Sequence, residues 1–458
     1  MSTPPLAGGP EGPEALRPLL DTVLDALHHG AVTRSGPLPA GGPDAVAAHV
    51  RGAVGDVLPD TGTGADEALR TLIGTFAHGA ADPAHPHCAA HLHTPPLALA
   101  AAADLAASAL NPSLDSWDQA PAASVLEQLV TRALASETYP TAPRPDALVT
   151  TGGTESNQLA LLLAREHHGP TLQTVCGANT HHSIRRAAWL LGLPEPVTVP
   201  APGGTIDLTA LAAVLTDLRG PLFVTATAGT TDTGSIDPLA DIADLCDTHG
   251  ATLHIDAAYG GPLLFSAARR HLLTGLDRAR TVTLDLHKLG WQPVAAGLLA
   301  VSDTAQLAAL GHTADYLNPD DDTHAGIPDL LGRSPRTTRR PDILKVAVTL
   351  RALGRTGLGT LVDRVCTTAD HLADLIEKSP HLQLHQRPTL TTVLFRPTDA
   401  TDHAVAATRR ALLTQGHAVL GRARADGRLW LKATLLNPHT TPDDLAHLTA
   451  LVEGSTTR

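Results

Sequence analysis

Residues 283–293 read TLDLHKLGWQP and place Lys288 directly after an apolar, strand-like segment. Only three other lysines occur in the 458 residues, beside many arginines. A lysine at a strand end is usually solvated, but this one lies between His287 and the apolar run Leu-Gly-Trp, which would desolvate its amine. A desolvated lysine suits attack on a carbonyl group to form a Schiff base. The stretch therefore predicts a covalently used amine at the end of a buried strand.

Strand-like runs alternate with helical segments around this stretch. The runs ALVTT, PLFVTAT, TLHID, TVTLDL and GLLAVS are interleaved with helical patterns at residues 124–136, 157–166 and 239–249. Such alternation predicts an α/β fold with a mainly parallel sheet covered on both sides. We expect an N-terminal tail and helical segment over residues 1–95, a large α/β domain over 96–345, and a small α+β domain over 346–458.

Two further motifs follow predicted strands. In TTGGTESN, residues 150–157, glycines precede a helix whose free N–H groups favour a phosphate, although the same turn also suits an ordinary helix start. In LHIDAAYGG, Asp256 ends a strand and is followed by Ala257 and Ala258. An aspartate there commonly caps a loop, but a buried one can pair with the ring nitrogen of a heterocycle. Together with Lys288, these parts match a pyridoxal phosphate (PLP) enzyme.

Composition argues against several classes of partner. The net charge is −13 and the pI is about 6.0, so neither nucleic acid nor an anionic membrane is expected to bind. The four cysteines form no CxxC pair, which disfavours a disulfide framework and a thiolate metal site. The first residues lack the pattern of a signal peptide, and no apolar run could span a bilayer. We expect a cytoplasmic enzyme with a small-molecule substrate.

The motifs resemble one family in particular. The chain is similar to the group II PLP-dependent amino-acid decarboxylases of fold type I, which are aspartate aminotransferase-like, and most of all to the bacterial L-2,4-diaminobutyrate and siderophore-pathway diamino-acid decarboxylases. The stretches that carry the resemblance cover nearly everything after residue 80: HCAAHLHTPPL, NPSLDSWDQAPA, TTGGTESNQLALLLAR, THHSIRRAAWLLG, HIDAAYGG, LDLHKLGWQP, ADYLNPDDD, TTRRPDILK and RLWLKATLLNPHTT.

The resemblance implies a role for individual residues and a seven-stranded, mostly parallel sheet. Lys288 would be the Schiff-base lysine and Asp256 the partner of the ring nitrogen, so that both would be catalytic together with His181, which would stack on the ring. His182 is a rival for that stacking position. The remaining cofactor contacts implied are Ala258 on the other ring face, Gly153, Thr154 and His287 at the phosphate, and Thr231 near the phenol oxygen. The family also implies a homodimer with shared active sites.

The resemblance also implies where the substrate binds. His91, His93 and Thr94 match the substrate segment of the family. Asp115 would suit the cationic side chain of a diamino acid, although an aspartate there could equally cap the next helix. The histidine-rich stretch HPHCAAHLH could suggest zinc, but its position in the family argues against a metal.

One departure from the family leaves the reaction open. Leu330 stands where relatives that act on aromatic substrates carry a loop tyrosine proposed to protonate the substrate. Decarboxylation of 2,4-diaminobutyrate, ornithine or lysine is the leading interpretation. The alternatives are decarboxylation with oxidative deamination to an aldehyde, an aminotransferase, and a catalytically inactive protein that binds or regulates a partner.

Overall fold

The computed structural model describes residues 3–455 and divides them into two compact units. The first unit comprises the described chain up to Pro95, Thr368–Arg387, and the described chain from Val393 onward. The second comprises Pro96–Thr367 and Pro388–Thr392. The three-part division expected from the sequence remains a prediction. Among the residues described, no helix has both the length and the apolar character needed to cross a bilayer.

The second unit is built on a seven-stranded sheet with the order β2-β8-β7-β6-β5-β3-β4. Five of the strands form a parallel block, and β8 pairs antiparallel with β7 and with β2. Their residues are almost entirely buried, as expected of strands covered on both faces. The strands are β2 (Asp146–Thr150), β3 (Gln173–Gly177), β4 (Val197–Val199), β5 (Leu222–Thr227), β6 (Thr252–Ala257), β7 (Thr281–Asp285) and β8 (Gly297–Val301).

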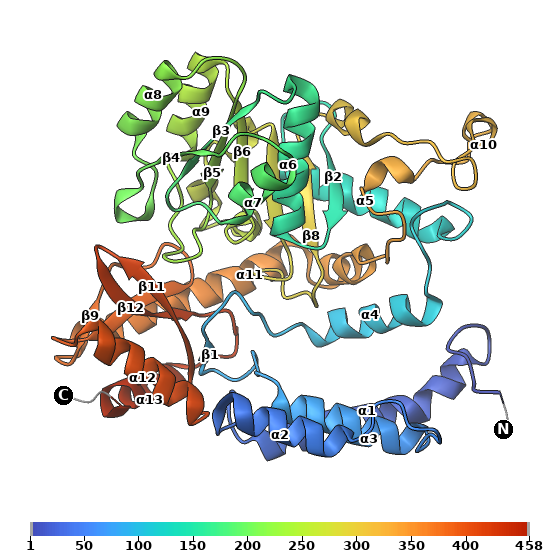
Figure 1. The fold of residues 1–458 in the computed structure, drawn as a ribbon, viewed down its shortest axis with the longest axis vertical. Coiled ribbons are helices and arrows are strands. Elements are labelled where there is room, and N and C mark those ends of the chain that lie inside the picture. The colour runs from blue at the N-terminus through green and yellow to red at the C-terminus, as the bar shows by residue number, and fades with distance from the viewer. Residues whose placement is uncertain (1–2, 456–458) are drawn as a thin grey trace. The chain divides into compact units, whose positions relative to one another are not determined.

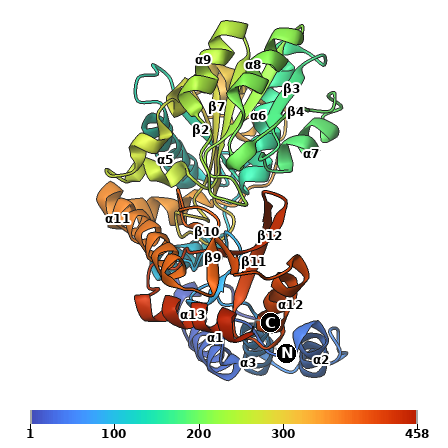
Figure 2. The same cartoon turned by 90° about the vertical axis from the view of Figure 1, so that its left-hand side faces the viewer.

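Helices cover this sheet (Figures 1 and 2). Helix α6 packs against β6, β7 and β8, whereas α9 packs against β5 and β6. Leu159, Leu161, Leu163 and Ala164 of α6 join a core cluster with Leu148 of β2. The helices that begin in this unit are α4 (Ala98–Leu110), α5 (Pro121–Thr138), α6 (Gly153–His168), α7 (Ser183–Leu190), α8 (Leu208–Asp217), α9 (Leu239–His249), α10 (Asp320–His324) and α11 (Ile343–Lys378).

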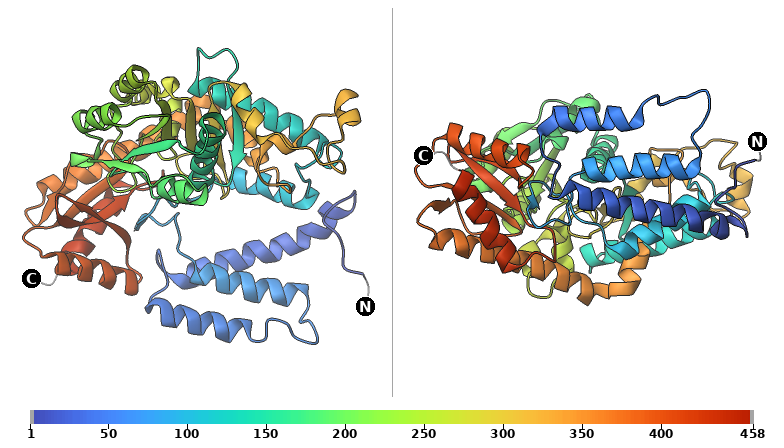
Figure 3. Two further views of the ribbon diagram at one scale, coloured as in Figure 1. Left: turned by 45° about the horizontal axis from the view of Figure 1, so that its top comes forward. Right: turned by 90° about the horizontal axis from the view of Figure 1, so that it is seen from below.

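The first unit contains a five-stranded sheet with the order β1-β11-β12-β10-β9. Its N-terminal helices form a separate group in which α1 packs against α3 (Figure 3). Buried side chains such as Phe395, Leu412 and Leu431 form the core on the sheet. The elements are α1 (Gly12–Arg34), α2 (Gly42–Val54), α3 (Ala65–Gly79), β1 (Cys88–Ala89), β9 (Leu382–Leu384), β10 (Thr392–Pro397), α12 (Asp402–Thr414), β11 (Val419–Ala425), β12 (Arg428–Thr434) and α13 (Pro442–Ser455).

The α/β class and the mostly parallel seven-stranded sheet are confirmed. All five strand-like runs named from the sequence are strands, and helix α9 begins and ends where its apolar pattern does. Strands β3 and β4 were not identified from the sequence. Strand β3 (QTVCG) has Val175 as its only aliphatic residue, and β4 has three residues at the edge of the sheet, where its burial pattern is mixed.

Candidate active site

A glycine turn connects β2 to the start of α6. A Cβ atom added at Gly152 would lie 2.9 Å from Cε1 of His287, and one added at Gly153 would lie 3.0 Å from Cβ of Ala258. The turn therefore packs closely against the segments that follow β6 and β7. No side chain at the N-cap position accepts a hydrogen bond from the first turn of α6. Its backbone N–H groups, which include those of Gly153 and Thr154, form a potential anion site.

Lys288 lies three residues beyond the end of β7 and forms an ion pair. Its Nζ is 2.9 Å from Oδ2 of Asp285, whose side chain is only 2% exposed. His287 approaches the same oxygen with Nε2 at 3.5 Å, and its Nδ1 accepts the backbone N–H of Ala296 at 3.4 Å. Burial lowers the pKa of His287, so the ring is neutral and carries its proton on Nε2. A lysine amine is thus held beside the glycine turn by a buried carboxylate.

Asp256 lies near the carboxyl end of β6 and is 5% exposed. Its Oδ2 accepts a hydrogen bond from Nδ2 of Asn157 at 2.8 Å, and its Oδ1 accepts one from the backbone N–H of Ala258 at 3.1 Å. Within residues 3–455, no lysine or arginine forms an ion pair with it. Burial of a carboxylate without a cation is unfavourable, which points to a cationic ligand group as the missing partner.

His181 lies two residues before the start of α7. Its Nδ1 is 2.8 Å from Oγ of Ser183 and 3.4 Å from the backbone nitrogen of Ser183. Burial lowers the pKa of His181, although the charge of Asp256 opposes this effect. His182 is in ring contact with His181, with ring centroids 4.1 Å apart. His181, rather than His182, is hydrogen-bonded to the polar groups around Asp256.

Two residues without an assigned role in the sequence analysis are central to this arrangement. Asn157 is fully buried in α6 and contacts Asp256, Ser183, His254 and Thr283. Asp285 pairs with Lys288, and its Oδ1 is buried without a hydrogen-bond partner among the residues described. Both lie inside the quoted motifs TTGGTESN and TLDLHKLGWQP. The available signal was a polar side chain at a position where the helix or strand faces the core.

The other two predicted cofactor contacts, Ala258 and Thr231, differ in burial and in their distance along the chain from the strand ends. Ala258 is buried directly after β6 and lies against the glycine turn. Thr231 lies in the turn after β5 and is exposed. The turn begins beside β6, because the backbone N–H of Ala228 donates to the carbonyl oxygen of Asp256 at 2.9 Å.

The predicted substrate residues fall in both units. Asp115 is buried in the second unit and accepts a hydrogen bond from Nε2 of Gln119 at 2.7 Å. His91, His93 and Thr94 belong to the first unit, where both histidines are exposed and Thr94 is buried. In the part of the chain that the structure describes, no three His, Cys, Asp or Glu side chains are placed to hold a metal ion.

Leu330 is a core residue of the second unit. Its side chain is buried in a cluster with Leu114 and Ala120, which flank the segment that contains Asp115. The position expected from the family to carry a loop tyrosine is therefore occupied by a packed apolar side chain. Such a side chain has no proton to donate.

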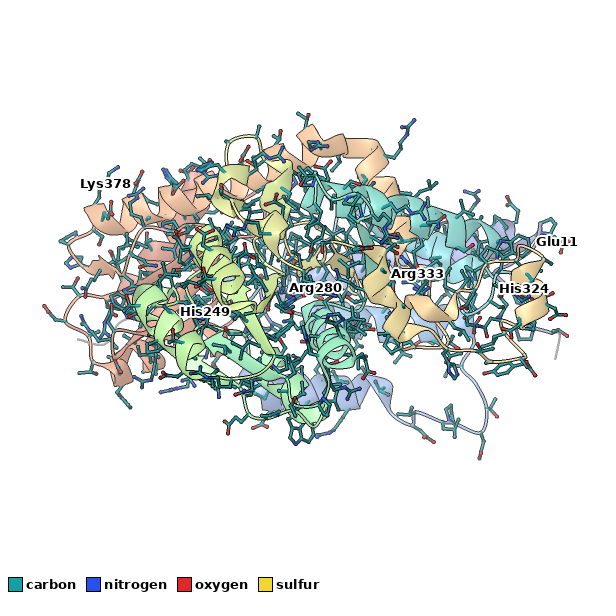
Figure 4. All side chains as sticks on the ribbon, turned by 90° about the horizontal axis from the view of Figure 1, so that it is seen from above. Glu11, His249, Arg280, His324, Arg333 and Lys378 are labelled. Atoms are coloured by element: carbon teal, nitrogen blue, oxygen red, sulfur yellow. The ribbon has the colours of Figure 1, made fainter. Side chains whose placement is uncertain are left out.

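Arginines anchor the segment that follows Leu330. Arg333 pairs with Asp146 of β2 at 2.6 Å, and Arg336 pairs with Glu155 of α6 at 3.1 Å. Glu155 also accepts the backbone N–H of Thr151 at 2.6 Å, so this segment is joined to the glycine turn. Figure 4 shows Arg333 among packed side chains, whereas His324, nearer the start of the same region, lies at the outer edge.

Comparison with known proteins identifies the family. The family model described as "Pyridoxal-dependent decarboxylase conserved domain" matches residues 59–398, and the chain belongs to this family. It is a carboxy-lyase that decarboxylates an amino acid, and its cofactor is PLP.

Several relatives are similar along most of their length. The L-2,4-diaminobutyrate decarboxylase of Rhizobium meliloti (strain 1021) is 41% identical over 412 residues, covering 86% of this chain and 83% of that protein. The enzyme of the same name from Acinetobacter baumannii is 32% identical over 429 residues, covering 85% and 84%. A crystal structure from Vibrio parahaemolyticus, the glutamate decarboxylase domain of diaminobutyrate-pyruvate transaminase and L-2,4-diaminobutyrate decarboxylase, is 32% identical with a TM-score of 0.87, covering 98% and 97%. The family resemblance and fold type I architecture expected from the motifs are confirmed.

The polar groups of the second unit fit PLP. The carboxylate of Asp256 has no cation beside it in the described chain and suits a protonated ring nitrogen. The glycine turn and the first N–H groups of α6 suit a phosphate. Lys288 carries the amine that an aldehyde requires, and the buried, unsatisfied Oδ1 of Asp285 beside the turn is a common feature of ligand sites.

Proposed function

We propose that the protein converts an aliphatic L-diamino acid to the corresponding amine and CO₂. Its preferred substrate would be 2,4-diaminobutyrate, with ornithine and lysine as the next candidates. The observation that carries the proposal is the 41% identity over 412 residues to an L-2,4-diaminobutyrate decarboxylase. In the reaction, the bond between Cα and the carboxylate carbon breaks, CO₂ leaves, and Cα gains a proton.

The cofactor, when bound, supplies a sink for the electron pair left on Cα. We assign Lys288 as the residue that bonds covalently to it, supported by the position of its amine beside the glycine turn. Asp256 would keep the ring nitrogen protonated, and Gly153, Thr154 and His287 would bind the phosphate. Ala258 and Thr231 remain proposed cofactor contacts, the first packed at the glycine turn and the second from the turn after β5.

His181 is the proposed donor of the proton to Cα as well as the residue that stacks on the ring. Two facts about the residues support this assignment: Leu330 has no proton to transfer, and burial lowers the pKa of His181, which makes its imidazolium form a stronger acid. The imidazole ring would take up a proton from solvent, and the imidazolium would then give one proton to Cα and return to its neutral form.

Substrate selection is assigned to Asp115, with His91, His93 and Thr94 as further contacts. A buried carboxylate attracts the distal ammonium of a diamino acid and disfavours a neutral or acidic side chain. Asp115 already accepts one hydrogen bond from Gln119, which leaves further acceptor capacity on the carboxylate.

We also propose a symmetric homodimer with shared active sites. Its support is a set of apolar side chains left exposed on α4 and α5, namely Leu105, Leu110, Val125 and Leu129. Light scattering on the eluted protein should give twice the chain mass of 47.4 kDa.

A product assay tests the function. The PLP-loaded protein is incubated with diaminobutyrate, ornithine, lysine, glutamate, tyrosine and tryptophan, and products are identified by mass spectrometry while peroxide is recorded. We expect the amine from a diamino acid, no peroxide, and a higher KM for that substrate in Asp115→Asn. An aldehyde with peroxide would establish oxidative deamination, and no turnover of any substrate would refute the proposal.

A further inference from the structure

The side-chain amide of Asn157 satisfies all of its hydrogen-bonding capacity inside the core of the second unit. Its Nδ2 donates to Oδ2 of Asp256 and to Oγ of Ser183, each at 2.8 Å. Its Oδ1 accepts from Oγ1 of Thr283 at 2.7 Å and faces Nε2 of His254 at 3.0 Å. An amide has two donor hydrogens and two acceptor lone pairs, so no capacity remains for another group.

The orientation of this amide follows from its partners. A carboxylate only accepts hydrogen bonds, so the group facing Asp256 must be the NH₂ end of Asn157. Its oxygen therefore faces His254, whose Nε2 must carry a proton. Burial lowers the pKa of His254 to about 4, so the ring is neutral and its Nδ1 accepts from Oγ1 of Thr281 at 2.8 Å. His254 thus supplies no positive charge to Asp256.

The contacts of Ser183 determine which ring nitrogen of His181 carries the proton. Oγ of Ser183 accepts from Asn157 and has one hydrogen of its own, which points at Nδ1 of His181, 2.8 Å away. The backbone N–H of Ser183 approaches the same Nδ1 at 3.4 Å. Two donors at one ring nitrogen require that nitrogen to be unprotonated. The proton of neutral His181 is therefore on Nε2.

We propose that Asn157 is a positioning residue that links Asp256 to His181 through Ser183, holding Asp256 ionised and His181 with its proton on Nε2. This inference rests on the proposed function, which assigns Asp256 and His181 to the cofactor. A donor hydrogen bond to a carboxylate favours its charged form. With Asp256 held ionised, the proton shared with a pyridine ring stays on the ring nitrogen. A single amide would thereby influence both the protonation of the ring nitrogen and the tautomer of His181.

The charges around His181 determine how its protonation responds. The ionisable groups that act on it are Asp256 of β6, Asp285 at the end of β7, Lys288 beyond that strand, and the neighbouring His182. Asp256 and Asp285 favour the imidazolium, whereas Lys288, His182 and burial oppose it. Removal of the Ser183 hydroxyl leaves these charges in place and removes one donor to Nδ1. Protonation of His181 should then become easier.

Two measurements on the holoenzyme test the link without using turnover. The first is the magnetic resonance signal of PLP labelled at its ring nitrogen, which reports whether that nitrogen is protonated. The second is the pH at which the absorbance of the bound cofactor changes as His181 titrates, assigned by its loss in His181→Asn. We compare Asn157→Leu with Ser183→Ala and with the matched control Thr283→Val, which removes one hydrogen bond to Asn157 but leaves its NH₂ partners.

The variants should give a crossed pattern. Asn157→Leu should shift the ring-nitrogen signal toward the unprotonated form and weaken PLP binding about tenfold, since a buried acceptor loses its donor. Binding of a carbocyclic PLP analogue, which has C–H in place of the ring nitrogen, should weaken less in this variant than binding of PLP does. Ser183→Ala should leave the ring-nitrogen signal unchanged but raise the His181 midpoint by about half a pH unit or more. Thr283→Val should move neither.

Specific results would overturn the proposal. Equal weakening of PLP and of the carbocyclic analogue in Asn157→Leu would show that Asn157 only supports the fold. An unchanged His181 midpoint in Ser183→Ala would break the link to His181, and this arm decides the matter if Asn157→Leu does not fold. The proposed function fails separately, if the wild-type protein forms no amine from any diamino acid. The crossed pattern does not depend on that assay.

Discussion

Two buried carboxylates end neighbouring parallel strands, yet their surroundings differ. Asp256 near the end of β6 is held by two neutral hydrogen-bond donors and has no ion-pair partner within the described chain. Asp285 at the end of β7 pairs with Lys288 at 2.9 Å and faces His287 at 3.5 Å. In the register of the sheet, Asp256 lies beside Thr283, two residues before Asp285.

The difference separates two uses of a buried negative charge. A carboxylate without an internal cation keeps its charge for a ligand, and its neutral donors keep it ionised. A carboxylate that already has a cation holds that cation in place, and here the cation is the amine of Lys288, which we propose bonds to the cofactor. Adjacent strands thus carry two different carboxylates. We call Asp256 of β6 the binding charge, because it is left for a ligand, and Asp285 of β7 the holding charge, because it is paired with Lys288.

Removal of the amine should have the largest effect. Lys288→Ala should lower kcat/KM by on the order of 10⁴-fold, because the nucleophile is lost. Borohydride treatment followed by mass spectrometry of the intact chain should find the cofactor attached in the wild-type protein and absent in the variant. Lys378→Ala, at the exposed end of α11, is the control and should behave as wild type. Retention of the covalent cofactor in Lys288→Ala would refute the assignment.

Removal of the binding charge should have the next largest effect. Asp256→Asn should lower kcat by about 10²- to 10³-fold, since the ring loses the charge that keeps it protonated. The borohydride-reducible link through Lys288 should persist, which distinguishes this variant from Lys288→Ala. Asp277→Asn, an exposed residue of the same unit, serves as the control. A loss smaller than about threefold would mean that Asp256 is not the binding charge.

The comparison also requires His254 to be neutral. Burial lowers its pKa from 6.5 to about 4 in the folded protein. Between these two pH values the unfolded chain binds a proton that the folded chain does not. The stability contribution is therefore complete above pH 6.5 and is lost as the pH falls toward 4. Chemical denaturation of the cofactor-free protein should show a loss of about 3 kcal/mol from this group over that range.

The variant His254→Gln removes the contribution of His254 to the pH dependence of the unfolding free energy. Its unfolding free energy should fall less steeply with decreasing pH than that of the wild-type protein, because one protonation is absent. His249→Gln, at the half-buried last residue of α9, should keep the wild-type slope. Equal slopes in His254→Gln and the wild-type protein would show that His254 is charged, and Asp256 would then have a cation of its own.

Much of the sheet and the identity of its end residues could be predicted from the sequence. Strands β2, β5, β6, β7 and β8 were recognised because each carries two or more aliphatic residues in a short run, as expected of strands that are buried on both faces. The placement of Asp256 near the end of one of these strands and of Lys288 just beyond another followed directly. Strand β3 (QTVCG) contains a single aliphatic residue, Val175, and the edge strand β4 has only three residues, so neither gave such a run.

The partners of the site residues could not be predicted in the same way. Asn157 contacts Ser183, His254 and Asp256, which are distant in the sequence and meet only when α6 packs on the sheet. The pairing of Lys288 with Asp285 is local, but a spacing of three residues after a strand does not fix which way either side chain points. Long-range contacts of this kind depend on the packing of the whole unit.

The smallest effect we predict concerns the holding charge itself. Lys288→Ala leaves Asp285 as a buried carboxylate with less compensation, since its side chain is 2% exposed and that of Lys288 is 19% exposed. Asp285→Asn should relieve that cost in the Lys288→Ala background but destabilise the wild-type background. A double-mutant cycle on the unfolding free energy of the cofactor-free protein should therefore give a coupling of about 1–2 kcal/mol.

An exposed ion pair of equal length provides the comparison for this cycle. Arg144 and Asp303 are also 2.9 Å apart, but their side chains are 61% and 41% exposed. Their cycle should give a coupling below about 0.5 kcal/mol, because water screens the charges. Similar coupling in both cycles would mean that Asp285 does not hold Lys288. A larger coupling at Asp285 alone would show that the cation beside this carboxylate is what distinguishes it from Asp256.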